Sequence, residues 1–322
     1  MKKTIAICLA LALLCFACFA AAETGDMTRQ QTAELLEKEG VVPVTWEPSA
    51  EHLIIEGEEA QALYTRIVNG DYPSMEELEA HPVVAQIDRL SEYYTDLYGY
   101  TIEIPGRETL REEIRKEFLA IGSARTESID LASGRHNYVY DGPLKAENRM
   151  TLVLGLPASG KSTRIVDPDS EAMSAFVLDP DFIKEELPEY KESHAAGADA
   201  VHFEGMNIFN EAVKAFTEGD MKGVNVILPI VSSDLNELME NYIRPFEAAD
   251  YNVKVKFKEA KPNEAAARVI MRELRGGQLI NSAVAFSFGD EPEAVYYELA
   301  SMINSNGEPY GYEVEEALAP AA

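Results

Sequence analysis

The second half of the chain alternates short apolar runs with longer amphipathic stretches. The apolar runs have the length and composition of buried strands, and they lie at 150–154, 176–178 and 224–228. A fourth strand is predicted at 253–257, where apolar and polar residues alternate. The amphipathic stretches have helical spacing and lie from residue 162 onward, then over 203–218, 234–248 and 263–275. Strands that alternate with helices predict a mostly parallel sheet with helices on both faces. We therefore expect an α/β domain over 149–316, followed by a frayed tail at 317–322.

The preceding stretch, 23–148, has mostly helical signals and predicts an α-rich N-terminal region. Apolar residues spaced by three or four predict a helix that buries one face and ends near Gly99, namely Val84, Ile87, Leu90, Tyr94 and Leu97. Three pairs are typical of capping boxes at helix starts, namely Thr28 with Gln31, Ser74 with Glu77, and Thr109 with Glu112. Apolar helical stripes serve core packing more often than ligand binding, so we expect these helices to pack on the α/β domain.

The first 22 residues have the order of parts that is typical of a secretory signal peptide. Lys2 and Lys3 precede an uncharged stretch over 4–22, which ends in small residues before the acidic Glu23. This pattern predicts cleavage before Glu23 and export to the periplasm or the medium. An uncleaved membrane anchor is the alternative, because the uncharged stretch is just long enough to span a bilayer. If this segment stays uncleaved, we expect the protein to contact a membrane through it and through no other part.

The net charge and the cysteine content exclude several classes of partner and of site. Acidic residues outnumber basic ones 56 to 28 in the 322-residue chain, which gives a formal net charge of −28. Such a charge repels phosphate backbones, so nucleic acid is not an expected partner, and a nucleotide site needs its cations concentrated locally. The three cysteines, Cys8, Cys15 and Cys18, all lie in the predicted signal peptide. The processed chain would therefore have no disulfide, thiolate metal site or cysteine nucleophile.

A nucleotide-binding motif follows the first predicted strand of the α/β domain. Residues 155–162 read Gly-Leu-Pro-Ala-Ser-Gly-Lys-Ser and fit the Walker A P-loop pattern, between a predicted strand and a predicted helix. In such a loop backbone N–H groups surround the phosphates, Lys161 reaches the β- and γ-phosphates, and the Ser162 hydroxyl ligates Mg²⁺. The motif predicts a P-loop kinase-type fold that binds ATP and Mg²⁺. The expected phosphate-binding residues are Gly155, Pro157, Ala158, Ser159, Gly160, Lys161, Ser162 and Thr163.

Two further groups of polar residues are candidates for chemistry. Asp179 and Asp181 follow the second predicted strand, where a carboxylate points into the crevice in which α/β proteins bind ligands. Either one is a candidate base or metal ligand, and helix capping is the alternative role. His202 and Glu204 open a later helix, where they are suited to hold a substrate hydroxyl or, alternatively, to cap and pack the helix.

These motifs together resemble the zeta toxin family of P-loop kinases. The resemblance rests on the P-loop, on the Asp-x-Asp-x-x-Lys-x-x-Leu-Pro-Glu-Tyr block at 179–190, on 201–204, on 225–229 and on a helix with two arginines, and it covers about 141–288. It implies transfer of the ATP γ-phosphate to a hydroxyl, best known for UDP-N-acetylglucosamine. It also implies Asp181 as the base that takes the hydroxyl proton, and Lys161 and Ser162 as the phosphate and Mg²⁺ contacts. We expect Asp179, His202 and Glu204 to contact the substrate.

The resemblance further implies that Arg268 or Arg272 stabilises the transferring charge, although arginines four residues apart also often pair with surface carboxylates. The chain departs from the family pattern at two places. Pro229 lies where an acid is expected after the third strand, and Gln278 lies where an arginine is expected, which leaves Arg275 as the nearest cation.

Three hypotheses follow from these residues. The first is an exported Mg²⁺-dependent kinase that acts on a small molecule such as a UDP-amino sugar. The second is a binding protein that retains nucleotide affinity without transfer, which the departures at Pro229 and Gln278 favour. The third is an exported interaction protein led by the acidic helical region. The expected partners are a nucleotide and a small-molecule substrate, and no feature of the sequence identifies an antitoxin partner.

Overall fold

The computed structural model describes residues 53–55, 57–121, 128–130, 135–137, 143–193, 195–276 and 278–311. The predicted signal peptide, the Thr28/Gln31 pair, Gly277 and the tail at 317–322 lie outside these residues. Within them, no helix combines the length and apolar character that crossing a membrane requires.

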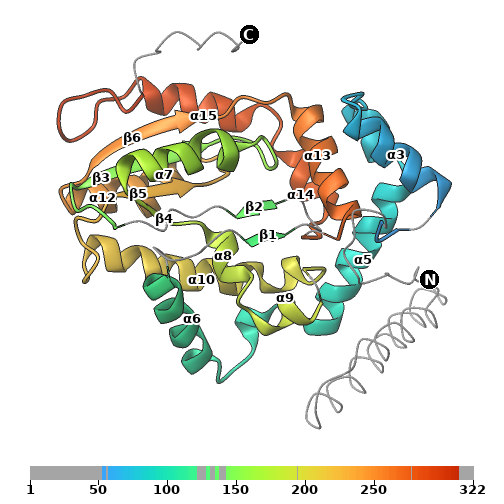
Figure 1. Cartoon of the computed structure of the whole chain (residues 1–322), viewed down its shortest axis with the longest axis horizontal. Helices are drawn as coiled ribbons and strands as arrows, with labels where there is room; N and C mark the ends of the chain where they lie inside the picture. Colours follow the sequence, from blue (N-terminus) through green and yellow to red (C-terminus); the bar gives the residue numbers. More distant parts are fainter. Residues whose placement is uncertain are drawn as a thin grey trace.

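A four-stranded parallel sheet forms the centre of the α/β domain (Figure 1). Its strands lie in the order β4-β5-β3-β6, with β3 at Arg149–Leu154, β4 at Phe176–Val177, β5 at Val226–Pro229 and β6 at Asn252–Phe257. The register pairs Leu152 of β3 with Leu228 of β5 and with Val255 of β6. All four strands fall within or beside the predicted segments, and the predicted α/β fold class is confirmed. Burial on both faces of the sheet explains the continuous apolar runs of β3, β4 and β5, whereas β6 buries every second residue and alternates.

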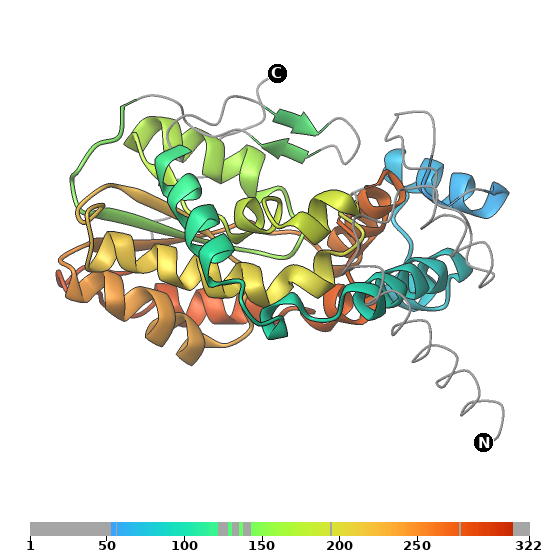
Figure 2. The same cartoon turned by 90° about the horizontal axis from the view of Figure 1, so that it is seen from below.

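Helices cover both faces of this sheet. The helix after the P-loop consists of η2 (Ser162–Val166) and α7 (Asp167–Met173), and the others in this part are α10 (Ala198–Thr217), α11 (Leu235–Leu238), η3 (Met239–Ile243), α12 (Arg244–Ala248), α13 (Pro262–Leu274), α14 (Ser282–Ser287) and α15 (Glu291–Ala300). Figure 2 shows the sheet edge-on, with α7 on one face and with α12 and α15 on the other. The short helices α8 (Pro180–Lys184) and α9 (Pro188–Glu192) follow β4.

The N-terminal region is mostly helical, as predicted, with α3 at Glu58–Val68, α4 at Met75–Glu79, α5 at Pro82–Tyr98, η1 at Thr101–Glu103 and α6 at Glu108–Ile121. Helix α5 ends against Gly99 and buries most of the predicted stripe, with Leu97 only partly buried. The capping box of Ser74 and Glu77 opens α4. The capping box predicted at Thr109 is wrong, because α6 already begins at Glu108. Glu112 instead pairs with Arg115 and Lys116, its neighbours on the helix surface.

A short antiparallel pair, β1 (Ser128–Asp130) with β2 (Arg135–Asn137), was not predicted. Segments of three residues are too short to show an alternating pattern, which explains the omission.

Helices α3, α4 and α5 of the N-terminal region pack on α13, which lies beyond the carboxyl ends of the strands (Figure 1). Leu63 of α3 and Ile87 of α5 share a hydrophobic core with Ile270 and Leu274 of α13. The Ile54 N–H also donates to the Leu274 carbonyl at 2.8 Å. Each fully buried aliphatic side chain stabilises such a contact by roughly 1.5–3 kcal/mol. The apolar stripes therefore have the partner surface that they were predicted to need.

Candidate active site

A large cavity opens at the carboxyl ends of the strands, and the P-loop forms its floor. Its volume is about 1270 Å³. It is lined by most of the residues predicted for the site, namely Pro157, Ala158, Ser159, Gly160, Lys161, Ser162, Thr163, Asp179, Asp181, His202, Arg268 and Arg272. The structure thus brings together side chains from the P-loop, α8, α10 and α13.

The P-loop has the backbone curvature that the motif predicts. Gly155 has a φ of 148°, and a Cβ atom there would approach the Lys258 carbonyl oxygen to 2.8 Å. Only glycine fits this combination of positive φ and close backbone approach. Ala158 and Gly160 also have positive φ values, 52° and 89°. Gly155 therefore determines the backbone conformation of the loop, and it does not line the cavity itself.

Lys161 lies at the base of the cavity, where its Nζ donates to the Gly155 and Leu156 carbonyls at 2.8 Å each. Burial lowers the pKa of Lys161 to about 8, and the nearby Arg272 acts in the same direction, against the effects of Asp179 and Asp181. An anion that binds beside this ammonium group would stabilise its charged form. The β- and γ-phosphates of a nucleotide would supply that partner.

The loop fits a nucleotide and its metal in two further ways. The Ser159 hydroxyl is buried and has no hydrogen-bond partner in the part of the chain that the structure describes. Ser162 is exposed to the cavity at the first turn of η2, where it would ligate Mg²⁺. No group of three or more His, Cys, Asp or Glu side chains suited to a metal lies together among the described residues. Mg²⁺ in P-loop proteins takes most of its ligands from phosphates and water.

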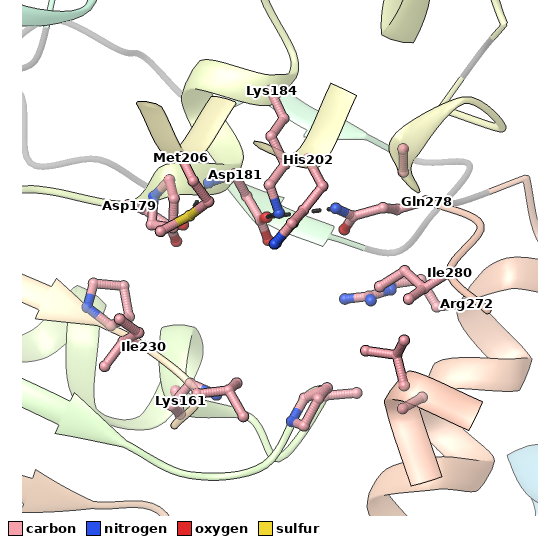
Figure 3. A pocket seen from close by; sticks show the side chains of 18 of the residues that line it. Lys161, Asp179, Asp181, Lys184, His202, Met206, Ile230, Arg272, Gln278 and Ile280 are labelled. Carbon is pink, nitrogen blue, oxygen red and sulfur yellow. Dashed lines mark hydrogen bonds and ion pairs between the residues drawn. The ribbon is translucent and has the colours of Figure 1, made fainter. Parts of the chain in front are cut away.

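Asp181 lies across the cavity from Lys161 (Figure 3). Its Oδ1 accepts a hydrogen bond from Lys184 Nζ at 3.0 Å and one from Gln278 Nε2 at 3.4 Å. Lys184 is buried against α10, and a Cβ atom at Gly205 would approach Lys184 Cγ to 2.7 Å. Gly205 therefore makes room for the lysine that holds Asp181.

Asp179 has both of the roles that were considered for it. Its Oδ1 accepts the Asp181 N–H at 2.9 Å and so caps α8, and its side chain also lines the cavity. The cap orients the first turn of α8, which carries Asp181. Capping and site formation are thus combined in one residue.

His202 opens into the cavity beside Asp181 (Figure 3). The surrounding protein and the Lys184 ammonium lower the pKa of His202 to about 4, although Asp181 opposes the shift. The imidazole is therefore neutral at pH 7, and a neutral ring both donates and accepts hydrogen bonds. This state suits contact with a substrate hydroxyl.

Glu204 does not line the cavity. It is fully buried and accepts hydrogen bonds from Arg107 at 2.8 and 3.0 Å and from Arg111 at 2.7 Å. Arg107 also pairs with Glu189 of α9. The packing role considered for Glu204 is the one that the structure shows, because these ion pairs tie α10 to α6 and to the turn before it.

The two arginines of α13 differ in their surroundings. Arg268 pairs with Glu264 at 2.6 Å and lies over the Tyr72 ring. Arg272 extends into the cavity (Figure 3), close enough to Lys161 to affect its pKa. Arg275 lies over the Tyr64 ring and does not line the cavity. Arg272 is thus the arginine best placed to face a transferring phosphate.

Both departures from the family pattern lie in the cavity wall. Pro229 ends β5 and lines the cavity with the apolar Ile230 and Val231, while Glu237 of α11 places a carboxylate in the same cavity wall. Gln278 is buried and reaches Asp181 from the loop after α13. The α13–α14 loop is held by Glu273, whose Oε1 accepts the Ile280 N–H at 2.9 Å.

Sequence reasoning missed one whole side of the cavity. Residues of the N-terminal region line it, namely Ser91, Glu92, Thr95 and Asp96 of α5 and Tyr100. Phe203 and Met206 of α10 complete this side. The spacing of the buried stripe on α5 indicates which face packs inward, but no motif in the sequence shows that the polar face meets the P-loop domain.

A model of the zeta toxin family matches residues 142–284, a little under half of the chain. The match covers the P-loop, Asp181, Arg272 and Gln278, so the resemblance is confirmed for this part of the molecule. It points to a P-loop domain that binds ATP and transfers phosphate. No curated protein and no solved structure gives a match.

Proposed function

We propose, on the basis of the zeta toxin domain at 142–284, that this chain transfers the ATP γ-phosphate to a hydroxyl of a small molecule. The observation that carries the proposal is the position of Asp181 opposite Lys161 across one cavity (Figure 3). A phosphotransferase needs an anion site on one side and a proton acceptor on the other. Positioning and charge neutralisation supply most of the catalysis of such a transfer.

In the proposed reaction, each side of the cavity has its own task. Lys161 and the P-loop amides hold the β- and γ-phosphates, and Arg272 faces the transferring group. Asp181 takes the proton of the acceptor hydroxyl while the acceptor oxygen forms a bond to the γ-phosphorus. The bond from that phosphorus to the bridging oxygen breaks, and ADP leaves. Mg²⁺, with Ser162 as a ligand, would offset the charge of the phosphates.

His202 supports this assignment from the acceptor side. Because its low pKa keeps the ring neutral at pH 7, it orients a hydroxyl by hydrogen bonding without competing for the base. Lys184 and Gln278 hold Asp181 Oδ1 and so fix the position of the carboxylate beside the acceptor in the proposed arrangement.

The experiment is an incubation of the purified chain with ATP, Mg²⁺ and candidate acceptors, with the products identified by mass spectrometry. UDP-N-acetylglucosamine belongs among the acceptors because the family resemblance implies a UDP-amino sugar. A product heavier by one phosphoryl group supports the proposal. The absence of product with every acceptor, together with ATP binding in a calorimetric titration, would contradict it.

The second candidate function is nucleotide binding without transfer. Gln278 favours it, because a neutral amide occupies the position at which the family places a cation. The same titration and product analysis separate the two functions, since binding without product supports the second.

We also propose that the protein is exported and that its processed form begins at Glu23, because small residues precede that position. Intact-mass analysis of protein from the envelope or medium tests this, and a retained segment 1–22 in the membrane fraction would contradict it.

A further inference from the structure

The cavity is larger than a nucleotide site requires. Its 1270 Å³ exceeds the roughly 300–1,000 Å³ that is common for a single small ligand, so there is room for a nucleotide and an acceptor together. One side of it comes from outside the zeta toxin match, namely from α5 and Tyr100. We call this side the α5 wall and define it by Ser91, Glu92, Thr95, Asp96 and Tyr100.

The α5 wall is continuous with the proposed base. His202 and Phe203 follow one another on α10, and their rings are in contact at 5.4 Å between centroids. Phe203 in turn meets the Tyr100 ring edge-on at 5.6 Å. Because His202 lies beside Asp181, a molecule with its hydroxyl at Asp181 would extend along α10 toward this aromatic pair.

The side chains of the α5 wall carry negative charge. Glu92 and Asp96 are one helical turn apart, and both are exposed to the cavity. A third carboxylate, Asp199 of α10, lies next to them and accepts hydrogen bonds from Ser91 Oγ at 2.7 Å and from the Asn281 N–H at 3.0 Å. The lysines and arginines that line the cavity belong instead to the P-loop, α8 and α13. The α5 wall is therefore acidic, whereas the rest of the cavity carries both signs of charge, because Asp167, Asp179, Asp181 and Glu237 line it beside those cations.

The aromatic pair adds a second kind of contact. Tyr100 is 44% exposed and Phe203 is 55% exposed, and both line the cavity, so their rings are open to a ligand there. Aromatic faces next to carboxylates suit a ring with hydroxyl groups and a positive charge, because the ring packs on the aromatic face and the cation is attracted to it. A phosphate at this position would instead meet like charge.

We propose that the α5 wall is the acceptor subsite and that it selects a polyhydroxylated compound with an amino group and without a phosphate of its own. The inference rests on the proposed phosphotransfer function and names its substrate class. Glu92 and Asp96 bind the ammonium group and neighbouring hydroxyls, and Tyr100 with Phe203 packs against the ring. In this proposal α5 and Tyr100, which lie outside the zeta toxin match, determine which acceptor the matched domain phosphorylates.

Three sugars that differ at one group provide the test: glucosamine with an ammonium group, N-acetylglucosamine without a charge, and glucosamine 6-phosphate with an added anion. We expect the full chain to use glucosamine with the highest kcat/KM and glucosamine 6-phosphate with the lowest. In the double variant Glu92→Gln and Asp96→Asn, the KM for glucosamine should rise about tenfold or more, as expected for loss of charge-assisted hydrogen bonds. The KM for ATP should stay the same.

The matched control is the double variant Glu113→Gln and Glu117→Gln. These acids have the same spacing on α6, are exposed and lie outside the cavity. They should leave the KM for each sugar unchanged. A rise in the KM for ATP in the α5 variant, with no change for glucosamine, would overturn the inference and assign the wall to the nucleotide.

A binding measurement keeps the inference separate from the proposed function. Saturation-transfer NMR of the three sugars, with a non-hydrolysable ATP analogue present, reports acceptor binding without turnover. Preference for glucosamine that is lost in the α5 variant supports the subsite even if no transfer occurs. Equal binding of the three sugars, stronger binding of the phosphorylated sugar, or binding of none of them overturns it. Failure of the analogue itself to bind would count against the proposed function instead.

Discussion

The two ends of the cavity are built in different ways. The phosphate end is one continuous segment, 155–163, whose shape comes from its own backbone and whose cation, Lys161, is part of the same motif. The acceptor end draws on α5, α8, α10 and the loop after α13, with residues from Glu92 to Gln278. The first end depends on local conformation, whereas the second depends on how distant elements pack together. Changes at the first end should therefore affect nucleotide binding, and changes at the second should affect transfer, specificity or stability.

The largest effect is expected at the phosphate end. Lys161→Ala removes the ammonium group that faces the phosphates in a protein whose overall charge repels them, so transfer should fall by roughly a thousandfold or more. ATP affinity should fall with it, and calorimetric titration measures this directly. Lys222→Ala, at an exposed lysine outside the cavity, is the control. Wild-type ATP affinity in Lys161→Ala would disprove the P-loop assignment.

The next prediction separates the two ends most sharply. Asp181→Asn keeps the shape of the side chain but removes the proton acceptor, so turnover should fall by roughly a hundredfold or more while ATP affinity stays nearly constant. Asp220→Asn, which is exposed and outside the cavity, should change neither quantity. Normal turnover by Asp181→Asn in a phosphotransfer assay would show that another group acts as the base.

The third prediction concerns what holds the acceptor end in place. Arg107→Ala leaves the buried Glu204 with Arg111 as its remaining ion-pair partner among the described residues and removes the partner of Glu189, so the free energy of unfolding should fall by about 3–4 kcal/mol. Urea denaturation measures the change. The control Arg149→Ala breaks an exposed pair with Glu147 and should cost less than about 1 kcal/mol. Equal effects in the two variants would mean that the buried network does not stabilise this junction.

A pH experiment tests the loop that carries Gln278. Burial raises the pKa of Glu273 from 4.5 to about 8, while the Ile280 N–H and Arg272 act against the shift. The folded protein then keeps a proton that the unfolded chain loses near pH 4.5, so the contribution of Glu273 to stability decreases as pH rises from about 4.5 to 8.

Glu273→Gln cannot lose a proton, and it removes this dependence. Relative to wild type, the variant should gain roughly 3–4 kcal/mol of stability between pH 5 and pH 8. Thermal or urea unfolding at the two pH values gives the comparison, and Glu298→Gln at an exposed position should show no such gain. The same gain in both variants would assign the pH effect to surface charge.

The smallest effect is expected for Gln278→Ala. Its hydrogen bond to Asp181 is long, at 3.4 Å, and Lys184 still holds the same oxygen, so turnover should fall only about three- to tenfold. ATP affinity should not change, and the exposed Gln61→Ala serves as the control. A hundredfold loss would show that Gln278 contacts the reacting groups rather than positioning Asp181.

The strands, most helices and the P-loop follow from local signals in the sequence. A strand that is buried on both faces is apolar along its whole length, and an amphipathic helix repeats its apolar residues every three or four positions. The P-loop is equally local, because Gly155 and Gly160 supply positive φ values within a single turn. The sequence determined these features by itself, including Asp179 and Asp181 at the end of a strand.

Only the tertiary structure decided which distant residues meet. The stripe on α5 shows that one face is buried, yet its packing against α13 is what brings Glu92 and Asp96 to the cavity. Glu204 has the sequence context of a site residue, but Arg107 and Arg111, more than ninety residues earlier, hold it in the interior. Gln278 likewise meets Asp181 across 97 positions. Such contacts depend on the packing of whole helices, and no residue type or short spacing in the chain specifies them.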